Sequence, residues 1–345
     1  MIFYNKTNKS LGGIETNKIK SKDVARKLNI SPATVSLVLN NKPGVSEKTR
    51  ELVLSYLAEE KGMIQVAAKP QYHIALVILK NYDLAPDNPG FWQLFDSISA
   101  QCPKYQCDFC SLTIEKEDPH LEKLEQYDGI IVWGIQASKE DLVRIRSLKV
   151  PAVIVCNEWD SDNQDTVISK HRRAVFGAVS YLVERGHQNI GYLRGNQPLN
   201  VFQLRYQLFQ NAIVHYGLKL KEDWIYAVDP TSIESSCQDF GQMIRSDLPT
   251  AFFGDNDLVA IGCMRALLEA GYRVPEDISI IGFGNIPISS VVTPSLTTFH
   301  EDAKKTGECA LDLLMKRIAD PDSDSVKVEV GTHLIARESV LNLSK

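Results

Sequence analysis

The chain has 345 residues, of which 44% are apolar and 23% charged, and its formal net charge is −5. These values are ordinary for a globular protein, and the length predicts two or three domains. No window offers about 20 uninterrupted apolar residues and the first residues lack the apolar core of a secretory signal, so neither a membrane span nor an export signal is predicted. We therefore expect a cytoplasmic protein whose seven cysteines are free thiols.

The charge is divided unevenly along the chain. Residues 1–69 hold 12 Lys+Arg against 6 Asp+Glu, whereas residues 70–345 hold 26 against 37. A basic end on an acidic body predicts that the N-terminal part binds phosphates, as a DNA-binding module does. The alternative is a solvated basic face without a partner.

Two short helices are predicted between Lys18 and Asn41, at about Lys22–Leu28 and Pro32–Leu39. The chain reverses at Asn29, a residue type that tolerates the left-handed conformation, and Ser31 is the predicted N-cap of the second helix. This pattern is typical of a helix-turn-helix, whose second helix enters the DNA major groove. The apolar residues predicted to form its core are Val24, Leu28, Ile30, Val35, Val38 and Leu39.

The flanking segments complete a small DNA-binding domain at residues 19–62. Residues 1–18 are polar and without periodicity, which predicts a flexible arm. Ser46 is placed to cap a third helix that ends before Gly62. Residues 63–71 form a short linker or hinge to the remainder of the chain.

From His73 onward, short apolar runs alternate with amphipathic stretches. The first predicted strand is His73–Leu79 and the last predicted helix is Asp302–Ala319. Such alternation predicts parallel sheets covered by helices, and the number of units favours two Rossmann-like lobes with a ligand cleft at the carboxyl ends of the strands. Gly282–Gly284 lacks the third glycine of a dinucleotide motif, and no P-loop, nucleophile elbow or metalloprotease motif occurs. No catalytic residues, cofactor or enzymatic activity are therefore predicted.

Three cysteines, Cys102, Cys107 and Cys110, have a spacing that resembles part of an iron–sulfur motif. The segment Tyr105–Ile114 is predicted to be a strand, on which positions 107 and 110 point to opposite faces. This geometry is poor for chelation, so small buried hydrophobic residues are preferred to a metal site.

Several longer segments occur together in one order and spacing: IKSKDVARKLNISPATVSLVLNNKPGVSEKTRELV, YDGIIVWG, VPAVIVCNE, LVERGHQNIGYLRG, PTAFFGDNDLVAIGCMRALLEAGYRVPEDISIIGFGN and PSLTTFHED. Through them the chain resembles the LacI/GalR family of bacterial transcription regulators over roughly residues 19–340. The resemblance implies a sequence-specific regulator, expected to be a repressor, that binds a pseudo-palindromic operator as a homodimer and responds to a small molecule.

The resemblance also implies a periplasmic-binding-protein-like body at residues 72–345, following the all-α helix-turn-helix headpiece. Its N-lobe is expected at about 72–168 and 299–324, and its C-lobe at about 169–298 and 325–345. The chain is expected to cross between the lobes near Ile168–Lys170, Thr297–His300 and Ser323–Lys327.

The recognition helix departs from the family pattern. Leu37 stands where relatives often carry an arginine, and Pro32 and Ala33 also lack polar side chains, so readout must depend on thymine methyls and DNA shape. The alternative for Leu37 is a packing residue without a DNA role. The linker is about half a dozen residues shorter than usual, which puts the family's hinge helix in doubt, with Met63 or Val66 as a substitute wedge. The predicted DNA-binding residues are Lys22, Ser31, Pro32, Ala33, Thr34, Ser36, Leu37, Asn40 and Ser46.

The residues expected in the effector cleft between the lobes also depart from the family pattern. Carboxylates that relatives use for sugar hydroxyls are replaced at Gly284 and Lys170, and Arg194 stands where a small residue is usual. With Arg205 these cations favour an anionic effector such as a sugar phosphate, although a neutral sugar is not excluded. Alternatives are a degenerate cleft without a ligand, or control by a protein corepressor. The predicted effector-binding residues are Phe91, Trp92, Lys170, Arg194, Arg205, Asn256 and Asn285.

The sequence disfavours two other classes of function. A solute-binding protein would share the body fold but would not carry the headpiece. An enzyme on the same scaffold would need a nucleophile, base and orienting group, and no such set is evident.

Overall fold

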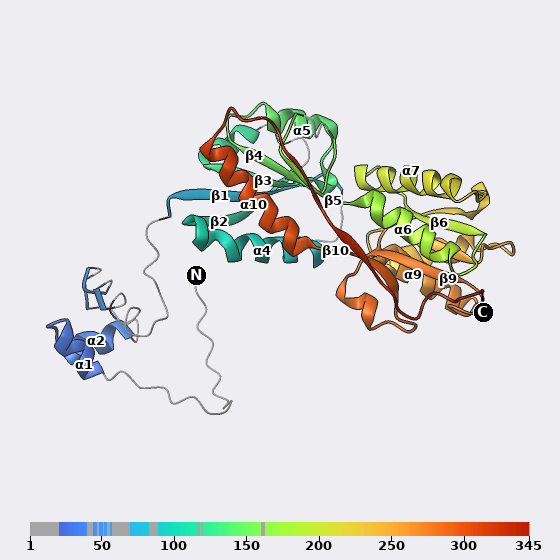
Figure 1. Ribbon diagram of the computed structural model, residues 1–345. Coiled ribbons are helices and arrows are strands. Elements are labelled where there is room, and N and C mark those ends of the chain that lie inside the picture. The colour runs from blue at the N-terminus through green and yellow to red at the C-terminus, as the bar shows by residue number, and fades with distance from the viewer. Residues whose placement is uncertain are drawn as a thin grey trace. The chain divides into compact units, whose positions relative to one another are not determined.

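A computed structural model describes residues 21–39, 44–46, 48–50, 52–53, 56, 70–82, 89–115, 118, 120–159 and 163–344 (Figure 1). The chain forms two compact units, Met1–Lys69 and Pro70–Lys345. The predicted arm at 1–18, Asn40 and the proposed wedge residues Met63 and Val66 lie outside the described residues, as does the side chain of Lys22.

The first unit contains the predicted helix pair. Helix α1 spans Ser21–Lys27 and α2 spans Pro32–Leu39. The Ser31 hydroxyl accepts the Thr34 backbone N–H at 3.0 Å, which confirms the predicted N-cap, and Asn29 has a φ of 52° at the reversal.

A small core joins the helices of this unit. Val24 on α1 and Val35 and Val38 on α2 are buried together with Val53 from a third helical segment, and Leu28 and Ile30 pack against them. The Ser46 hydroxyl accepts the Thr49 N–H at 3.2 Å, as predicted for the cap of that segment.

In the second unit, the first lobe is built on a parallel six-stranded sheet of order β11-β5-β4-β3-β1-β2. Helix α4 continues through Pro103, so the strand expected from Tyr105 begins at Cys107. The strands are β1 Tyr72–Lys80, β2 Cys107–Glu115, β3 Gly129–Trp133, β4 Ala152–Val155, β5 Thr166–Ser169 and β11 Lys327–Val330. The helices are α4 Pro89–Tyr105, α5 Lys139–Arg146 and α10 Ala303–Ala319, with 3₁₀ turns η1 Leu121–Gln126 and η2 Gly134–Gln136.

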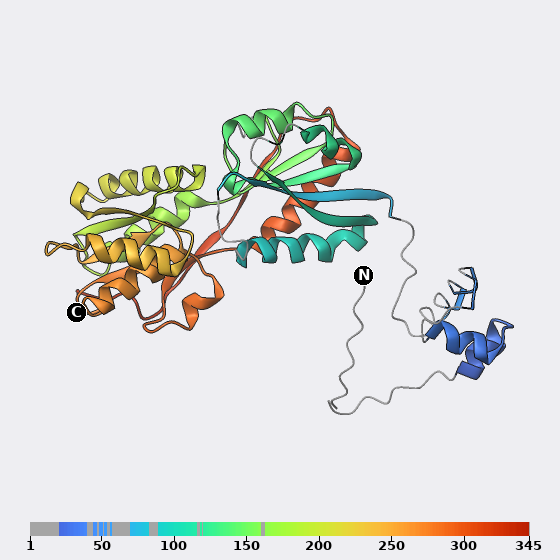
Figure 2. The same cartoon turned by 180° about the vertical axis from the view of Figure 1, so that it is seen from behind.

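The second lobe has a six-stranded sheet of order β12-β10-β9-β8-β6-β7, in which only β12 is antiparallel to its neighbour. Its strands are β6 Ile190–Gly195, β7 Ile225–Val228, β8 Ala251–Gly254, β9 Ser279–Gly284, β10 Thr297–Glu301 and β12 Thr332–Ile335. Its helices are α6 His171–Val183, α7 Asn200–His215, α8 Ile233–Met243 and α9 Asp257–Glu269, with 3₁₀ turns η3 Glu222–Trp224 and η4 Pro287–Ser290. The two Rossmann-like lobes are as predicted (Figures 1 and 2).

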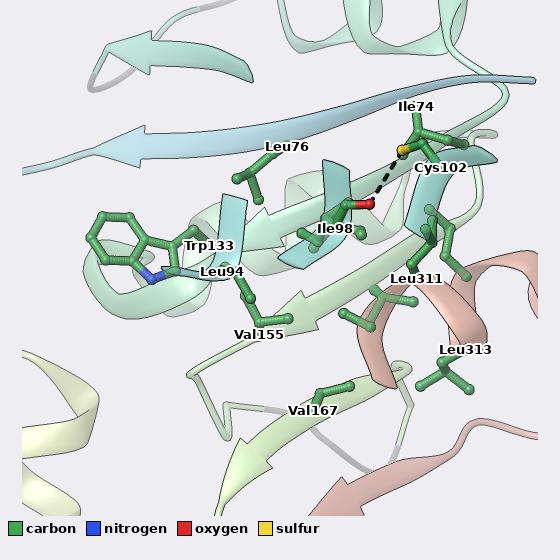
Figure 3. Close-up of a cluster of buried hydrophobic side chains, with 14 of the residues drawn as sticks. Ile74, Leu76, Leu94, Ile98, Cys102, Trp133, Val155, Val167, Leu311 and Leu313 are labelled. Atoms are coloured by element: carbon green, nitrogen blue, oxygen red, sulfur yellow. Dashed lines mark hydrogen bonds between the residues drawn. The ribbon is translucent and has the colours of Figure 1, made fainter. Parts of the chain in front are cut away.

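Each sheet of the second unit is buried on both faces, which explains its nearly continuous apolar strands. In the first lobe, α4 and α10 cover one face, where Leu94, Ile98 and Leu311 pack against strand residues (Figure 3). Cys102 and Cys107 belong to this cluster, whereas Cys110 packs against the cluster on the opposite face. The cysteines therefore lie on two faces of the sheet, as their spacing on a strand predicts.

Three connections join the lobes, at Lys170, at Asp302 and at Gly331. The first two lie at or next to the predicted crossings. The third prediction, Ser323–Lys327, is wrong, because Lys327–Val330 first pairs with β5 as an edge strand of the first lobe. The C-lobe segment predicted from residue 325 accordingly begins at Thr332. No helix among the described residues is long and apolar enough to cross a membrane.

Candidate DNA-binding face and hinge cavity

The front of α2 presents short side chains and no charge. Ser31, Pro32, Ala33 and Ser36 are exposed, whereas Thr34 is half-buried. Neither end of the helix carries an acidic or basic residue. Such a face can contact thymine methyls and phosphates, but it cannot form a bidentate guanidinium contact with guanine.

Leu37 lies at the edge of this face. Its side chain is half-buried, and its Cδ1 is 3.9 Å from the position that a Cβ on Gly44 would occupy. Leu37 therefore has both a packing surface and an accessible one.

The first unit also carries exposed cations on its other helical segments. Lys27 in the last turn of α1 and Lys48 in the third helical segment are both exposed. Neither lysine was among the residues predicted to bind DNA, although the net positive charge of residues 1–69 predicts cations on the surface of this unit. Both can contact DNA phosphates, which position a protein without reading sequence.

A cavity of about 630 Å³, called the hinge cavity below, lies between the lobes of the second unit. Its walls are mainly apolar, as in most small-molecule sites. The apolar side chains that line it include Leu94, Trp133, Ile135, Leu199, Val201, Phe202, Ile233, Phe283, Ile286 and Ile288. Trp133 and Phe283 come from strands β3 and β9, so the cavity lies beyond the carboxyl ends of the sheet strands, where open α/β sheets bind ligands.

Arg205 on α7 supplies the guanidinium of the cavity. It is 6% exposed, its Cζ lies 4.1 Å from the centre of the Phe283 ring, and one terminal nitrogen donates to the Asp255 carbonyl. Its Nε has no partner among the described residues. A buried donor without a partner is costly, so an acceptor that reaches this nitrogen would be stabilised.

Asp255 lies directly after β8, and its backbone carbonyl accepts the hydrogen bond from Arg205. Its carboxylate accepts the Tyr192 hydroxyl at 2.5 Å and the Gly195 N–H at 2.8 Å. Burial raises the pKa of Asp255 to about 6, against the opposing effect of Arg205.

Glu301 at the end of β10 supplies the second charged group. Its side chain is half-buried, lines the cavity, and has no hydrogen-bond or ion-pair partner among the described residues. Burial and then Glu301 raise the pKa of the Cys156 thiol to about 12, whereas Arg205 lowers it. Glu301, Arg205 and Cys156 all line this one cavity.

Two other carboxylates at the cavity are already engaged. Asp257 accepts the Ser289 hydroxyl at 2.6 Å, the Thr298 hydroxyl at 2.6 Å and the Ile286 N–H at 2.9 Å, and burial raises its pKa. Glu234 pairs with Arg265 at 2.6 Å. Asp257 and Glu234 are therefore already paired with groups of the protein. Among the described carboxylates that line the cavity, Glu301 is the one left without a protein partner.

Three of the predicted effector residues line the cavity: Arg205, Asn256 and Asn285. The side-chain oxygen of Asn256 caps α9 by accepting the Val259 N–H at 2.8 Å. The Asn285 amide is held between His300 at 3.2 Å and Arg337 at 2.6 Å, and its φ is 57°. Of these three residues, Arg205 has a buried side-chain nitrogen without a partner among the described residues, whereas Asn256 and Asn285 use their side-chain oxygens within the protein.

The other four lie elsewhere, which corrects the expectation that they line the cleft. Gly90, Gln93 and Leu94 share the face of α4 that lines the cavity, so Phe91 and Trp92 point away from it. Phe91 is buried against Trp133, with ring centres 5.1 Å apart, and Trp92 is 50% exposed.

The predicted cluster of three cations is also not found at the cavity. Lys170 is exposed and lines a second pocket. The Cζ of Arg194 lies 5.2 Å from the centre of the Tyr206 ring, and Arg194 is not among the residues that line the cavity. Arg205 alone remains, opposed by Glu301. Trp133, Phe202, Phe283 and Glu301 were missed, although three of these four lie at strand ends.

Comparison with known proteins now identifies the family. The model for bacterial regulatory proteins of the lacI family matches residues 21–60, and that for a periplasmic binding protein-like domain matches residues 179–340. The HTH-type transcriptional repressor PurR of Pasteurella multocida is 31% identical over 331 residues, which cover 92% of this chain and 98% of that protein. The chain belongs to the lacI family. It is a DNA-binding transcriptional repressor of that family.

Solved structures agree with this fold. The lac repressor dimer bound to operator and the anti-inducer ONPF has a TM-score of 0.70 at 24% identity, covering 94% of this chain and 99% of that one. A LacI family regulator from Enterococcus faecium with bound ribose has a TM-score of 0.67 at 25% identity, covering 78% of this chain and 99% of that one.

Proposed function

We propose that this lacI-family repressor binds a pseudo-palindromic operator as a homodimer in the cytoplasm and that a small molecule in the hinge cavity controls it. The observation that carries the proposal is the pair of unpartnered groups, Arg205 Nε and the Glu301 carboxylate, in one cavity between the lobes. A ligand that contacts both lobes stabilises one relative arrangement of them, which is how such a body can change its affinity for DNA.

The effector is an uncharged ring compound that offers both an acceptor and a donor. An acceptor on the ligand satisfies Arg205, and a hydroxyl or N–H donates to Glu301. The rings of Phe202, Phe283 and Trp133 suit a ring face, as in a sugar or a heterocycle. An anion is disfavoured, because Glu301 would repel it and Lys170 and Arg194 do not line this cavity.

A ligand panel tests this assignment by calorimetry. It contains neutral mono- and disaccharides, nucleobases and nucleosides, and the corresponding phosphates. A neutral member should bind, and Glu301→Gln should weaken it, whereas Glu276→Gln, which alters an exposed carboxylate outside the cavity, should not. Preferential binding of a phosphate, unaffected by Glu301→Gln, contradicts the proposal. Binding of no member would favour control by a protein partner.

DNA readout depends on shape, thymine methyls and phosphates, because α2 lacks charged base readers. Selection from a random DNA pool should yield a palindrome whose affinity falls steeply with salt. Lys27→Ala should weaken binding to all sequences alike and reduce the salt slope by about one. Leu37→Ala should instead alter base preference, and an unchanged selected sequence in that variant would assign Leu37 to packing alone.

A further inference from the structure

A second pocket of about 480 Å³ lies at the first connection between the lobes. Ser169 lines both this pocket and the hinge cavity, so the connecting segment separates the two. From this pocket we infer a second binding site, for a small phosphate ester, formed by the start of α6 and the apolar side chains beside it.

The polar half of the pocket is the N-terminus of α6, a helix of 13 residues. The N-cap residue Lys170 makes no capping hydrogen bond with its side chain, and the N–H groups of His171, Arg172 and Arg173 donate to no acceptor among the described residues. Free N–H groups and the helix dipole together favour an anion at this position.

A buried imidazole supplies the independent observation. His171 is 4% exposed and lines this pocket, and its Nδ1 has no partner among the described residues. Burial, and then Arg205 and Lys327, lower its pKa well below the ordinary value, so the ring is neutral near pH 7. Its Nδ1 can then donate to a ligand oxygen in one of its two tautomers.

The charge balance of the pocket favours an anion. Lys170, Arg172 and Arg173 are exposed and form no ion pair with any described carboxylate, although Arg172 stacks on Phe176 at 4.3 Å. Two carboxylates also line the pocket. Glu158 is neutralised by Lys327 at 3.0 Å, which leaves Glu329 against three cations. A guanidinium binds phosphate oxygens in a forked geometry, and three cations suit the charge of a phosphate ester, about −2, better than that of a single carboxylate.

The other half of the pocket is apolar. Phe176 on α6 and Leu204 and Leu208 on α7 line it. Inorganic phosphate would fill the polar half alone, whereas an ester would also place its organic part on these side chains. The chemical class is therefore a phosphate ester with an apolar or aromatic portion. This inference does not depend on the effector proposed for the hinge cavity.

Calorimetry with the full chain tests the site, using inorganic phosphate and phenyl phosphate as probes. Phenyl phosphate should bind at one site and more tightly than inorganic phosphate. Arg173→Ala and Lys170→Ala should each weaken it by about three- to tenfold, corresponding to the loss of one charge at a helix N-terminus. Lys219→Ala, which removes an exposed cation outside the pocket, is the matched control and should change nothing.

Imidazole NMR gives a second readout that does not depend on the variants folding. Phenyl phosphate should shift the ring signals of His171 and leave those of the exposed His120 unchanged. No binding in the millimolar range, equal weakening by Lys219→Ala, or an unshifted His171 would overturn the site. Equal affinity for the two probes would overturn its assignment to an ester.

Discussion

Asp255 makes the stability of the body depend on pH in a direction opposite to most carboxylates. The residue is fully buried, and burial raises its pKa from 3.8 to about 6. A folded-state pKa above the unfolded value means that the stabilising contribution is fully present below pH of about 4 and is lost as the pH rises through about 6. The shift corresponds to about 3 kcal/mol in total, of which about 2 kcal/mol falls between pH 4.5 and 8.

The substitution Asp255→Asn isolates this contribution, because asparagine stays neutral. It leaves one oxygen for the Tyr192 hydroxyl and the Gly195 N–H, which imposes a cost that does not vary with pH. Urea unfolding of both proteins across this range should show the wild type losing about 2 kcal/mol relative to the variant as the pH rises. A difference that is flat with pH, or that changes in the opposite direction, would refute the reasoning.

Three further changes test other parts of the structure. Asp165→Ala removes a buried carboxylate that holds Arg317 through two hydrogen bonds of 2.7 and 3.0 Å, and it should lower the free energy of unfolding by about 3–5 kcal/mol in denaturant titrations. Ser31→Ala removes the cap of α2 and should cost the headpiece about 1 kcal/mol and weaken operator binding in anisotropy titrations, whereas Ser290→Ala, in the body, should leave both unchanged. Gly195→Ala would place a Cβ 2.4 Å from the Phe202 ring and should weaken effector binding in calorimetry by displacing that wall, and unchanged affinity would contradict this.

The fold could be predicted because its signals are local or periodic. The N-cap at Ser31 and the reversal at Asn29 each depend on the chemical type of one residue. The predicted strand Gly129–Trp133 matches β3 because it is a short run of buried apolar residues. Lys327–Val330 was missed as a strand, because on an exposed sheet edge it alternates charged and apolar residues without a continuous apolar run.

The cavity could be predicted less well, because its lining depends on helix phase and on long-range packing. Arg205 was identified from its position in a motif, whereas Phe91 and Trp92 were assigned to the cleft although the cavity face of α4 passes through Gly90, Gln93 and Leu94. A shift of one residue on a helix turns a side chain by about 100°, which is enough to move it from a ligand into the core. Glu301 carried no motif, and its place at the strand ends follows from the pairing of β10 with β9 and β12, which are distant in the sequence.

Lys170 shows that a charge found in the sequence can lie away from the site for which it was predicted. Lys170 and Arg194 were expected beside Arg205, which favoured an anionic effector, but Lys170 lines the second pocket, while the hinge cavity contains Glu301 and Arg205. Because Ser169 borders both spaces, a ligand in either one contacts the same connection between the lobes. Movement of that connection on binding one ligand would alter the other site, and linkage requires any such effect to be reciprocal. A neutral effector and a phosphate ester could then regulate one repressor through a single segment.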